Sequence, residues 1–420
     1  MQKILILSYF FPPSNLTASQ RIEGWAKNLS KFGYYPIVIT RNWDVQGPLE
    51  KDRLKPSGSK IEIVENDGCE VHYLPYKPSL RDYCLNKDLT FFSKIFTFLE
   101  LVLRNFFIGI IPFHNLHSYA QKILESDKGI RHLLISANPY EQFYFGYKLK
   151  KRFKYLKWIA DYRDEWTTRE SYGTSRGKNG IVKFLEKRSE FKWLQNSDLV
   201  ITTCNYFAKR IASHLDRTVN VIEHGVSVQS LSPANTCAID KEMFIIVYGG
   251  TLYSNQPVER FLKVWSVFKS GKSDVEFILL GSKMDVSIED RFQSVDMTSV
   301  SITERLSKER SDIIQKKSAM LLLLPYIGMK GWPSSKLYHY LAYKRPILFY
   351  PNDHDIMEKV LLDTETGIIP KDDSDLLSAL EAQYLFWKKG ELAAVEPKNI
   401  SRYTQRSRAE ILAKNINKLN

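Results

Sequence analysis

The 420-residue chain has few cysteines and no cysteine pattern that holds a metal ion or a redox pair. Cys69, Cys84, Cys204 and Cys237 are widely spaced, and none of them has the spacing of a zinc ligand or of a disulfide-exchanging pair. We therefore expect reduced thiols in packed positions, with no disulfide framework and no metal.

A long uninterrupted apolar run is also missing. The most apolar segment, Leu89 to Phe113, is broken by Lys94, Glu100, Arg104 and Pro112, whereas a membrane-spanning helix needs about 20 consecutive, mostly apolar residues. The segment is typical either of a helix that rests on an anionic membrane surface or of a helix packed in a core. The sequence leaves both interpretations open.

The first apolar run lacks both a cleavage site and a glycine-rich turn. Ile4 to Tyr9 leads into Phe-Phe-Pro-Pro-Ser-Asn, which indicates a strand rather than a signal peptide. Without G-x-G-x-x-G, a nicotinamide or flavin dinucleotide is not expected. We expect this loop, with Pro13 and Ser14, to line an acceptor site and Arg21 to be available to a phosphate, although spacing alone favours a solvated helix face for Arg21.

The composition is that of a globular protein with a basic balance. Hydrophobic residues make up 44% and charged residues 25% of a chain that is too long for one ordinary core. Lysine and arginine total 60 against 47 acidic residues, so the net charge is +13. This charge favours anionic partners. Because the basic residues are scattered and no nucleic-acid-binding motif accompanies them, we expect phosphorylated substrates or a membrane surface rather than nucleic acid.

Short apolar runs alternate with helical patterns along most of the chain, which predicts an α/β fold. Ile4 to Tyr9, an amphipathic stretch at Ala18 to Phe32 and Pro36 to Thr40 form a strand, helix, strand unit with parallel strands. Further buried strands are expected at Ile61 to Val64, Glu70 to Leu74, His132 to Ser136, Trp158 to Asp161, Leu199 to Thr202 and Val219 to Ile222.

A second series of the same kind begins near Met243. Its expected strands are Phe244 to Tyr248, Val275 to Leu280, Ala319 to Leu324 and Pro346 to Phe349, and its helices are Val258 to Phe268, Glu304 to Lys317 and Lys336 to Tyr343. The polar stretch Ser230 to Asp240 indicates a linker. We therefore predict two facing Rossmann-like domains, residues 1–229 and 241–400, with the active site in a deep cleft between them.

The run WIADYRDEW, residues 158–166, places charged groups at the end of an expected parallel strand. Ligands bind at the carboxyl ends of such strands. Asp161 or Asp164 can orient a hydroxyl or act as a base, and Arg163 can clamp phosphate oxygens. The competing interpretation is an internal pair, Asp161 with Arg163 or Arg163 with Asp164, that stabilises the loop.

Two segments of the second half favour anion binding. Gly249, Gly250 and Thr251 follow a strand, where backbone amides can approach a diphosphate. Ser335 and Lys336 open a later helix. A lysine in a first turn opposes the helix dipole unless an anion offsets it, so we interpret Lys336 as an anion-binding residue.

Taken together, these motifs resemble the retaining glycosyltransferases of family 4. The landmarks, in order, are ILSYFFPP with Arg21 and Gly33, SANPY from Ser136, DYRDEW from Asp161, SDLVITTC, VIEHGV, YGGTLY and KLYHYLAYKRPIL from Lys336. The resemblance covers nearly the whole chain. It implies the GT-B fold, with residues 401–420 as a terminal helix that crosses back to the first domain.

The resemblance also implies a reaction. A sugar would pass from a nucleoside-diphosphate sugar to a hydroxyl, with retention at the anomeric carbon and with neither metal nor cofactor. Lys336 would stabilise the departing diphosphate with amides around Gly249 to Thr251, and Asp161 and Arg163 would lie near the transferred sugar.

The chain departs from the family pattern at two places. His339 stands where the family usually has a glutamate that binds the donor ribose, and Tyr253-Ser-Asn-Gln replaces a basic pair after the glycine turn. A neutral imidazole can still bond a hydroxyl, but without a charge-assisted bond.

The leading hypothesis is therefore an enzyme of bacterial-type surface polysaccharide synthesis with a lipid-linked or saccharide acceptor. We expect it in the cytoplasm, peripheral at the inner face of the cell membrane. A noncatalytic nucleotide-sugar-binding or scaffold protein is the second hypothesis, motivated by His339, and a nucleotide-sugar epimerase on the same fold is the third.

Overall fold

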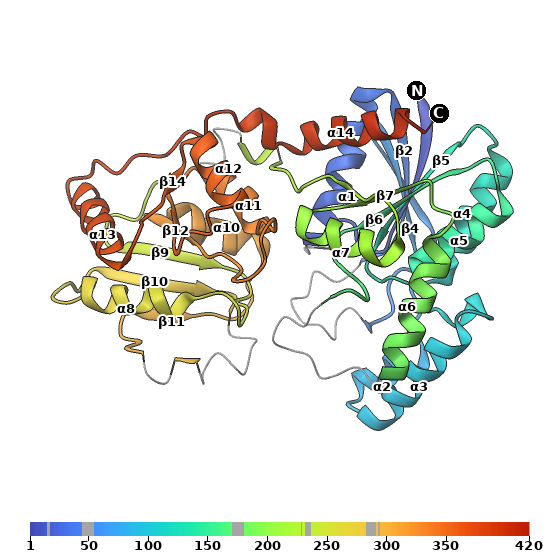
Figure 1. Ribbon diagram of the computed structural model, residues 1–420, viewed down its shortest axis with the longest axis horizontal. Coiled ribbons are helices and arrows are strands. Elements are labelled where there is room, and N and C mark those ends of the chain that lie inside the picture. The colour runs from blue at the N-terminus through green and yellow to red at the C-terminus, as the bar shows by residue number, and fades with distance from the viewer. Residues whose placement is uncertain are drawn as a thin grey trace. The chain divides into compact units, whose positions relative to one another are not determined.

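The computed structural model describes residues 1–14, 17–43, 54–169, 180–227, 229–231, 237–282, 291–292 and 295–419. The chain forms two compact units (Figure 1). The first takes in the described residues as far as Gly225 together with those from Gln405 onward, and the second runs from Val226 to Thr404. Part of the expected linker, residues 232–236, lies outside the described residues.

The first unit is built on an eight-stranded sheet with the strand order β3-β4-β2-β1-β5-β6-β7-β8. Its strands are β1 Gln2–Ser8, β2 Tyr34–Arg41, β3 Glu62–Asn66, β4 Cys69–Leu74, β5 His132–Ala137, β6 Lys157–Tyr162, β7 Leu199–Thr202 and β8 Asn220–Val221. Its helices are α1 Thr17–Asn28, α2 Leu80–Asn86, α3 Thr90–Leu103, α4 His114–Ser126, α5 Gln142–Arg152, α6 Gly180–Leu194, α7 Asn205–Leu215 and α14 Gln405–Asn417, with 3-10 turns η1 Leu29–Phe32 and η3 Ile108–Ile110.

Alternate residues of the central strands face opposite helical layers, as the period of two requires. Ile4 and Ile6 of β1 join a core that α1 and α14 complete. Leu5 and Leu7 are buried on the opposite face, where α4 packs against β1. The terminal helix α14 contributes Ala409, Leu412, Ala413 and Ile416 to the first core, so it is an integral layer of this unit.

The second unit has a six-stranded, fully parallel sheet in the order β11-β10-β9-β12-β13-β14. Its elements are η4 Gln229–Leu231, β9 Phe244–Gly249, α8 Val258–Phe268, β10 Val275–Leu280, β11 Val300–Ile302, α10 Lys308–Lys317, β12 Met320–Leu323, α11 Ser335–Tyr343, β13 Ile347–Phe349, α12 Ile356–Thr364, β14 Gly367–Ile368, α13 Asp373–Lys388 and η6 Ile400–Tyr403. Helices α8 and α13 cover one face, and α11 and α12 cover the other.

Both sheets have a topological switch point, where the chain stops adding strands on one side of the first strand and begins to add them on the other side. It lies between β1 and β5 in the first unit and between β9 and β12 in the second. In doubly wound sheets, ligands bind outside the carboxyl ends of the strands at this point. The predicted α/β fold with two Rossmann-like units is confirmed, and its topology directs attention to two strand ends.

Two expectations of buried strands are wrong, because β3 is exposed and β8, expected at Val219 to Ile222, is only partly buried at the other edge of the sheet. Ile61 to Val64 was expected to form a buried strand, but β3 is an antiparallel edge strand exposed along its whole length, because it pairs with β4 alone. Of the two interpretations left open for Leu89 to Phe113, the core helix is excluded: α3 ends at Leu103, and among its residues only Ser93 and Leu101 are buried. Within the described residues, no helix is both long and apolar enough to cross a bilayer.

Candidate functional site

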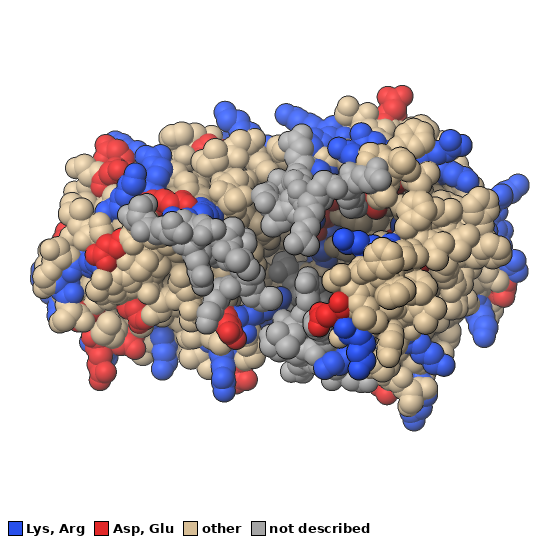
Figure 2. Space-filling model, turned by 90° about the horizontal axis from the view of Figure 1, so that it is seen from below, with Lys and Arg blue, Asp and Glu red and all other residues tan. Residues whose placement is uncertain are grey.

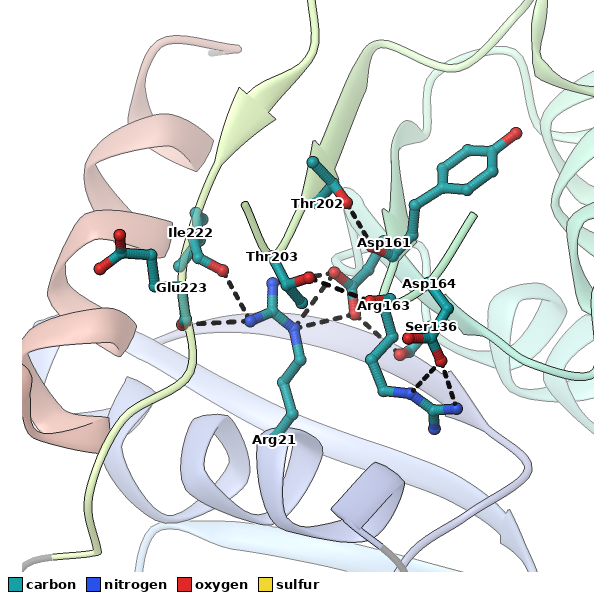
Figure 3. A network of polar contacts seen from close by, with 10 residues as sticks. Arg21, Ser136, Asp161, Arg163, Asp164, Thr202, Thr203, Ile222 and Glu223 are labelled. Carbon is teal, nitrogen blue, oxygen red and sulfur yellow. Dashed lines mark hydrogen bonds and ion pairs between the residues drawn. The ribbon is translucent and has the colours of Figure 1, made fainter. Parts of the chain in front are cut away.

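The switch point of the first unit holds a buried ion pair between Arg21 and Asp161 (Figure 3). Arg21 Nη2 lies 3.0 Å from Asp161 Oδ1, and the Arg21 and Asp161 side chains are only 2% and 0% exposed. Ser136 Oγ donates a 2.8 Å hydrogen bond to the other carboxylate oxygen. The interpretation of Arg21 as a solvated-face residue is therefore wrong, because α1 presents this side chain to the sheet.

Arg21 also ties the end of the sheet to the chain that follows β8. Its Nη1 donates to the carbonyl oxygens of Ile222, at 2.7 Å, and Glu223, at 3.2 Å. The guanidinium stacks 4.4 Å from the ring of Trp25. Because the arginine and the carboxylate are both saturated with partners, this network fixes α1, β5, β6 and the 222–223 segment relative to one another.

Arg163 and Asp164 stand apart from this network. Arg163 Nη2 lies 2.9 Å from Asp164 Oδ2, with side chains 14% and 40% exposed, and Figure 3 shows the Arg163 side chain directed away from Asp161. The internal-pair interpretation holds for Arg163 with Asp164, while Asp161 pairs with Arg21. The charged groups of the motif that reach solvent are thus Arg163 and Asp164.

The loop after β1 contributes little charge to this edge. Ser14 is buried and its amide donates to Phe11 O at 3.1 Å, whereas Pro13 is exposed. Sequence reasoning missed Ser136 and the 222–223 carbonyls as parts of the network. The SANPY and VIEHGV landmarks, which contain them, were the available signal.

At the switch point of the second unit, Lys336 extends from the first turn of α11 toward the end of β9. Its Nζ donates to Thr251 O at 3.2 Å and lies 4.9 Å from the Tyr248 ring centroid. In the described part of the chain, no carboxylate pairs with it. The Lys336 side chain is partly buried, and this burial lowers its pKa to about 8, so at neutral pH the site holds a positive charge that an anion can neutralise.

The glycine amides that were expected to cradle a diphosphate already donate to acceptors in the fold. Gly249 N–H donates to Tyr340 Oη at 2.9 Å, and Gly250 N–H donates to Leu280 O at 2.7 Å. Among the described residues, the Thr251 amide has no acceptor. We therefore expect Thr251 to contribute the amide of an anion site. Ser335, the first residue of α11, directly precedes Lys336.

His339 lies one turn beyond Lys336 on α11 and is partly buried. Burial, with a smaller contribution from Lys308, lowers the pKa of His339 to about 4. The imidazole is therefore neutral at physiological pH, where it can exchange a hydrogen bond with a hydroxyl but adds no charge.

The backbone of Gly250 lies beside the Lys336 side chain. It has φ +91°, and a Cβ there would lie 3.2 Å from Lys336 Cε. We expect Gly250→Ala to lower the free energy of unfolding by about 1–2 kcal/mol from backbone strain and to displace the ammonium, weakening diphosphate binding.

The matched control is Gly271→Ala, which has φ +75° and no neighbouring atom within 4 Å. Urea unfolding should show a similar loss of stability in both variants, while calorimetric titration with a nucleoside diphosphate should show weaker binding only for Gly250→Ala. Equal affinities in the two variants would separate Gly250 from the anion site.

Two Rossmann-like units with their polar residues at the carboxyl strand ends define the GT-B class of α/β folds. No protein-family model matches the chain, and no curated protein matches it. The solved structures that it resembles do so at low identity, so the likeness establishes the fold alone.

Among these structures is sucrose-phosphate synthase from Thermosynechococcus elongatus, with TM-score 0.58 and 14% identity, covering 100% of this chain and 98% of that one. Another is described as trehalose-6-phosphate from E. coli bound with UDP-2-fluoro glucose, with TM-score 0.57, 11% identity and coverage of 99% and 98%. A third, the α,α-trehalose-phosphate synthase of Burkholderia xenovorans in complex with glucose-6-phosphate, has TM-score 0.59, 11% identity and coverage of 99% and 100%.

Proposed function

We propose that this chain is a retaining, metal-independent glycosyltransferase that moves a sugar from a nucleoside-diphosphate sugar to a hydroxyl of a lipid-linked saccharide. The observation that carries the proposal is Lys336: a partly buried ammonium that, among the described residues, has no carboxylate partner, at the N-terminus of α11 and beside the end of β9. Structures of similar fold include one bound to a UDP-sugar analogue and one in complex with a sugar phosphate.

In the proposed reaction, the bond between the anomeric carbon and the diphosphate oxygen breaks, and its electron pair leaves with the diphosphate. The acceptor hydroxyl oxygen forms the new bond to the anomeric carbon, and its proton passes to an oxygen of the departing diphosphate. Negative charge grows on the leaving oxygen, and a fixed cation in a water-poor site stabilises it. Lys336 would supply this charge, assisted by the Thr251 amide and Ser335, while His339 would bond a donor hydroxyl.

In the first unit, we assign substrate contact to Arg163 and Asp164, whose side chains reach solvent. Asp161 would act through Arg21 and Ser136 by holding the carboxyl ends of β5 and β6 in place. The Arg163 guanidinium suits a phosphate or hydroxyl of the acceptor, and the Asp164 carboxylate suits a hydroxyl.

The test is a panel of nucleotide sugars, offered with lipid-phosphate acceptors and analysed by mass spectrometry. One donor is expected to add a single sugar to the acceptor and release the nucleoside diphosphate. Binding without transfer would support the scaffold hypothesis, which the neutral His339 motivates. Conversion of the donor sugar without acceptor would support the epimerase. If no donor binds and none is consumed, the proposal is contradicted.

Donor affinity should depend on pH through Lys336. In the free protein its pKa is about 8, and a bound diphosphate raises that pKa by favouring the charged form. The dissociation constant should therefore be flat below about pH 8 and increase by up to about tenfold per pH unit above it. Calorimetric titrations on both sides of this pH measure the effect, and an affinity that does not change across it would exclude the lysine charge from binding.

A further inference from the structure

Helix α3 turns an apolar face to solvent, while Ser93 is buried and the charged groups of Glu100 and Arg104 pair with the protein. Phe91, Ile95, Phe98 and Val102 recur at spacings of four, three and four residues, which places them on one helical face, and all are exposed. Phe91 is 69% exposed. A soluble helix places such a face against a core, so this arrangement needs another explanation.

Polar contacts hold the opposite side of α3 to the first unit. Glu100 pairs with Arg81 of α2 at 2.8 Å, and Arg104 at the end of α3 pairs with Glu141 at 2.7 Å. The Arg104 guanidinium also lies 5.1 Å from the Trp193 ring. The helix is thus fixed with its apolar face outward, rather than loosely attached.

Neighbouring elements extend the apolar face. Leu80 on α2, Phe106 and Phe107 after α3, and Ile181 and Phe184 on α6 are each more than 60% exposed. Helix α3 packs against both α2 and α6. We call this surface, formed by α2, α3, residues 106–107 and α6, the helical apolar surface. Figure 2 views the side on which α2 and α3 project in Figure 1 and shows a broad uncharged area there, with lysine and arginine at its margin.

The charged residues of this surface are mainly basic. Lys94 on α3 and Lys183, Lys187, Arg188 and Lys192 on α6 are exposed. The acidic residues of the two helices are less available: Glu100 is paired with Arg81, Glu190 is buried against Tyr162, and Glu186 is partly buried. Exposed phenylalanines beside lysine and arginine match the boundary of a bilayer with anionic headgroups.

The helical apolar surface is connected to the loops that follow β5 and β6. Glu141, the partner of Arg104, comes just after β5, and Arg104 lies 5.8 Å from the ring of Trp166 in the DYRDEW loop. Tyr140 stacks on Trp166 at 5.1 Å between centroids. The surface and the partly exposed Arg163–Asp164 pair therefore share one rigid framework at the carboxyl edge of the first sheet.

We infer that the helical apolar surface docks the first unit on an anionic lipid bilayer, with α3 lying in the plane of the headgroups and its phenylalanines among the acyl chains. This position presents the Arg163–Asp164 edge to an acceptor whose lipid tail stays in the same bilayer. The identity of the acceptor rests on the proposed function, whereas the docking itself does not.

The test is flotation of the full chain with phosphatidylcholine vesicles that do or do not contain phosphatidylglycerol. The wild type should bind the anionic vesicles preferentially and lose binding at high salt. Phe91→Ser/Phe98→Ser should weaken binding by about tenfold or more, because two exposed rings no longer enter the acyl region. The control Leu385→Ser/Phe386→Ser removes exposed apolar side chains of α13 in the second unit and should bind as the wild type does.

A donor-induced thermal shift, measured on the same variants, separates this inference from the proposed function. Vesicle binding that is lost only in Phe91→Ser/Phe98→Ser supports docking, whether or not any donor shifts the melting temperature. A wild type that ignores anionic vesicles, or a double variant that binds them equally well, overturns it. Loss of an oligomer in the double variant, without vesicle binding by the wild type, would assign the surface to a protein interface instead.

Discussion

Lys336→Ala should weaken the binding of nucleoside-diphosphate sugars by about 10- to 100-fold, because a hydrogen bond to a charged group contributes about 1.5–3 kcal/mol. Turnover should fall further, by about 100- to 1000-fold, since the lysine charge would be felt most strongly where the leaving diphosphate gains charge. Calorimetric titration and initial-rate measurements with the donor found in the panel measure the two effects separately.

Loss of folding would not explain this result. The lysine is partly buried and, among the described residues, has no carboxylate partner, and burial lowers its pKa to about 8, so its removal should leave the melting temperature of the free protein unchanged or raise it. Lys359→Ala removes an exposed lysine of α12 in the same unit and should keep wild-type affinity. If Lys336→Ala and Lys359→Ala bind the donor alike, Lys336 is not the anion-binding residue.

Asp161→Asn should lower the free energy of unfolding by about 3–5 kcal/mol, because it leaves the Arg21 guanidinium as an uncompensated buried charge. The pair is almost completely enclosed and has no access to solvent that could replace the lost carboxylate. The carbonyls of Ile222 and Glu223 would remain as the polar partners of Arg21. Equilibrium urea unfolding followed by circular dichroism measures the loss.

Asp164→Asn is the matched control, since it changes a nearby acid of the same motif in a partly exposed pair. Its effect on unfolding should stay below about 1 kcal/mol, while acceptor transfer should decrease because Asp164 is assigned to substrate contact. Replacing both members, Arg21→Met with Asp161→Leu, should recover part of the stability lost in Asp161→Asn. Equal stability of the two asparagine variants would remove the anchoring role from Asp161.

Most of the sheet strands were predictable because their residues form short β-rich apolar runs between turn residues, whereas the very short edge strands β11 and β14 were not predicted. The run at Phe244 to Tyr248 and the observed β9 Phe244–Gly249 differ by one residue. The edge strand β3 was not predictable in its burial, because a short apolar run looks the same whether one neighbour or two will pair with it. Burial there is decided by the position in the sheet, which is a property of the whole topology.

The sequence predicted which residue types lie at the strand ends of the candidate site. It did not predict which of them form ion pairs and hydrogen bonds with one another. Arg21 and Asp161 are far apart in sequence. Pairs within the motif, Arg163 with Asp161 or with Asp164, fit the sequence equally well. Similarly, the sequence predicts that the Gly249 and Gly250 amides bind phosphate. In the fold these amides instead donate hydrogen bonds to Tyr340 Oη and Leu280 O. Such pairings depend on tertiary packing that no local pattern encodes.

The sequence also could not predict which face of α3 is turned toward the protein. The sequence shows an apolar segment with isolated charges, and both a core helix and a surface helix satisfy that pattern. Only the contacts of Glu100 and Arg104 with the protein reveal which face is turned inward.

A crystal structure of the protein with a nucleoside-diphosphate sugar tests the central claim most directly. The diphosphate should lie at the start of α11, with one of its oxygens within hydrogen-bonding distance, about 3 Å, of Lys336 Nζ. A diphosphate bound elsewhere, or a Lys336 ammonium that keeps its contact with Thr251 O and makes none with the ligand, would contradict the account.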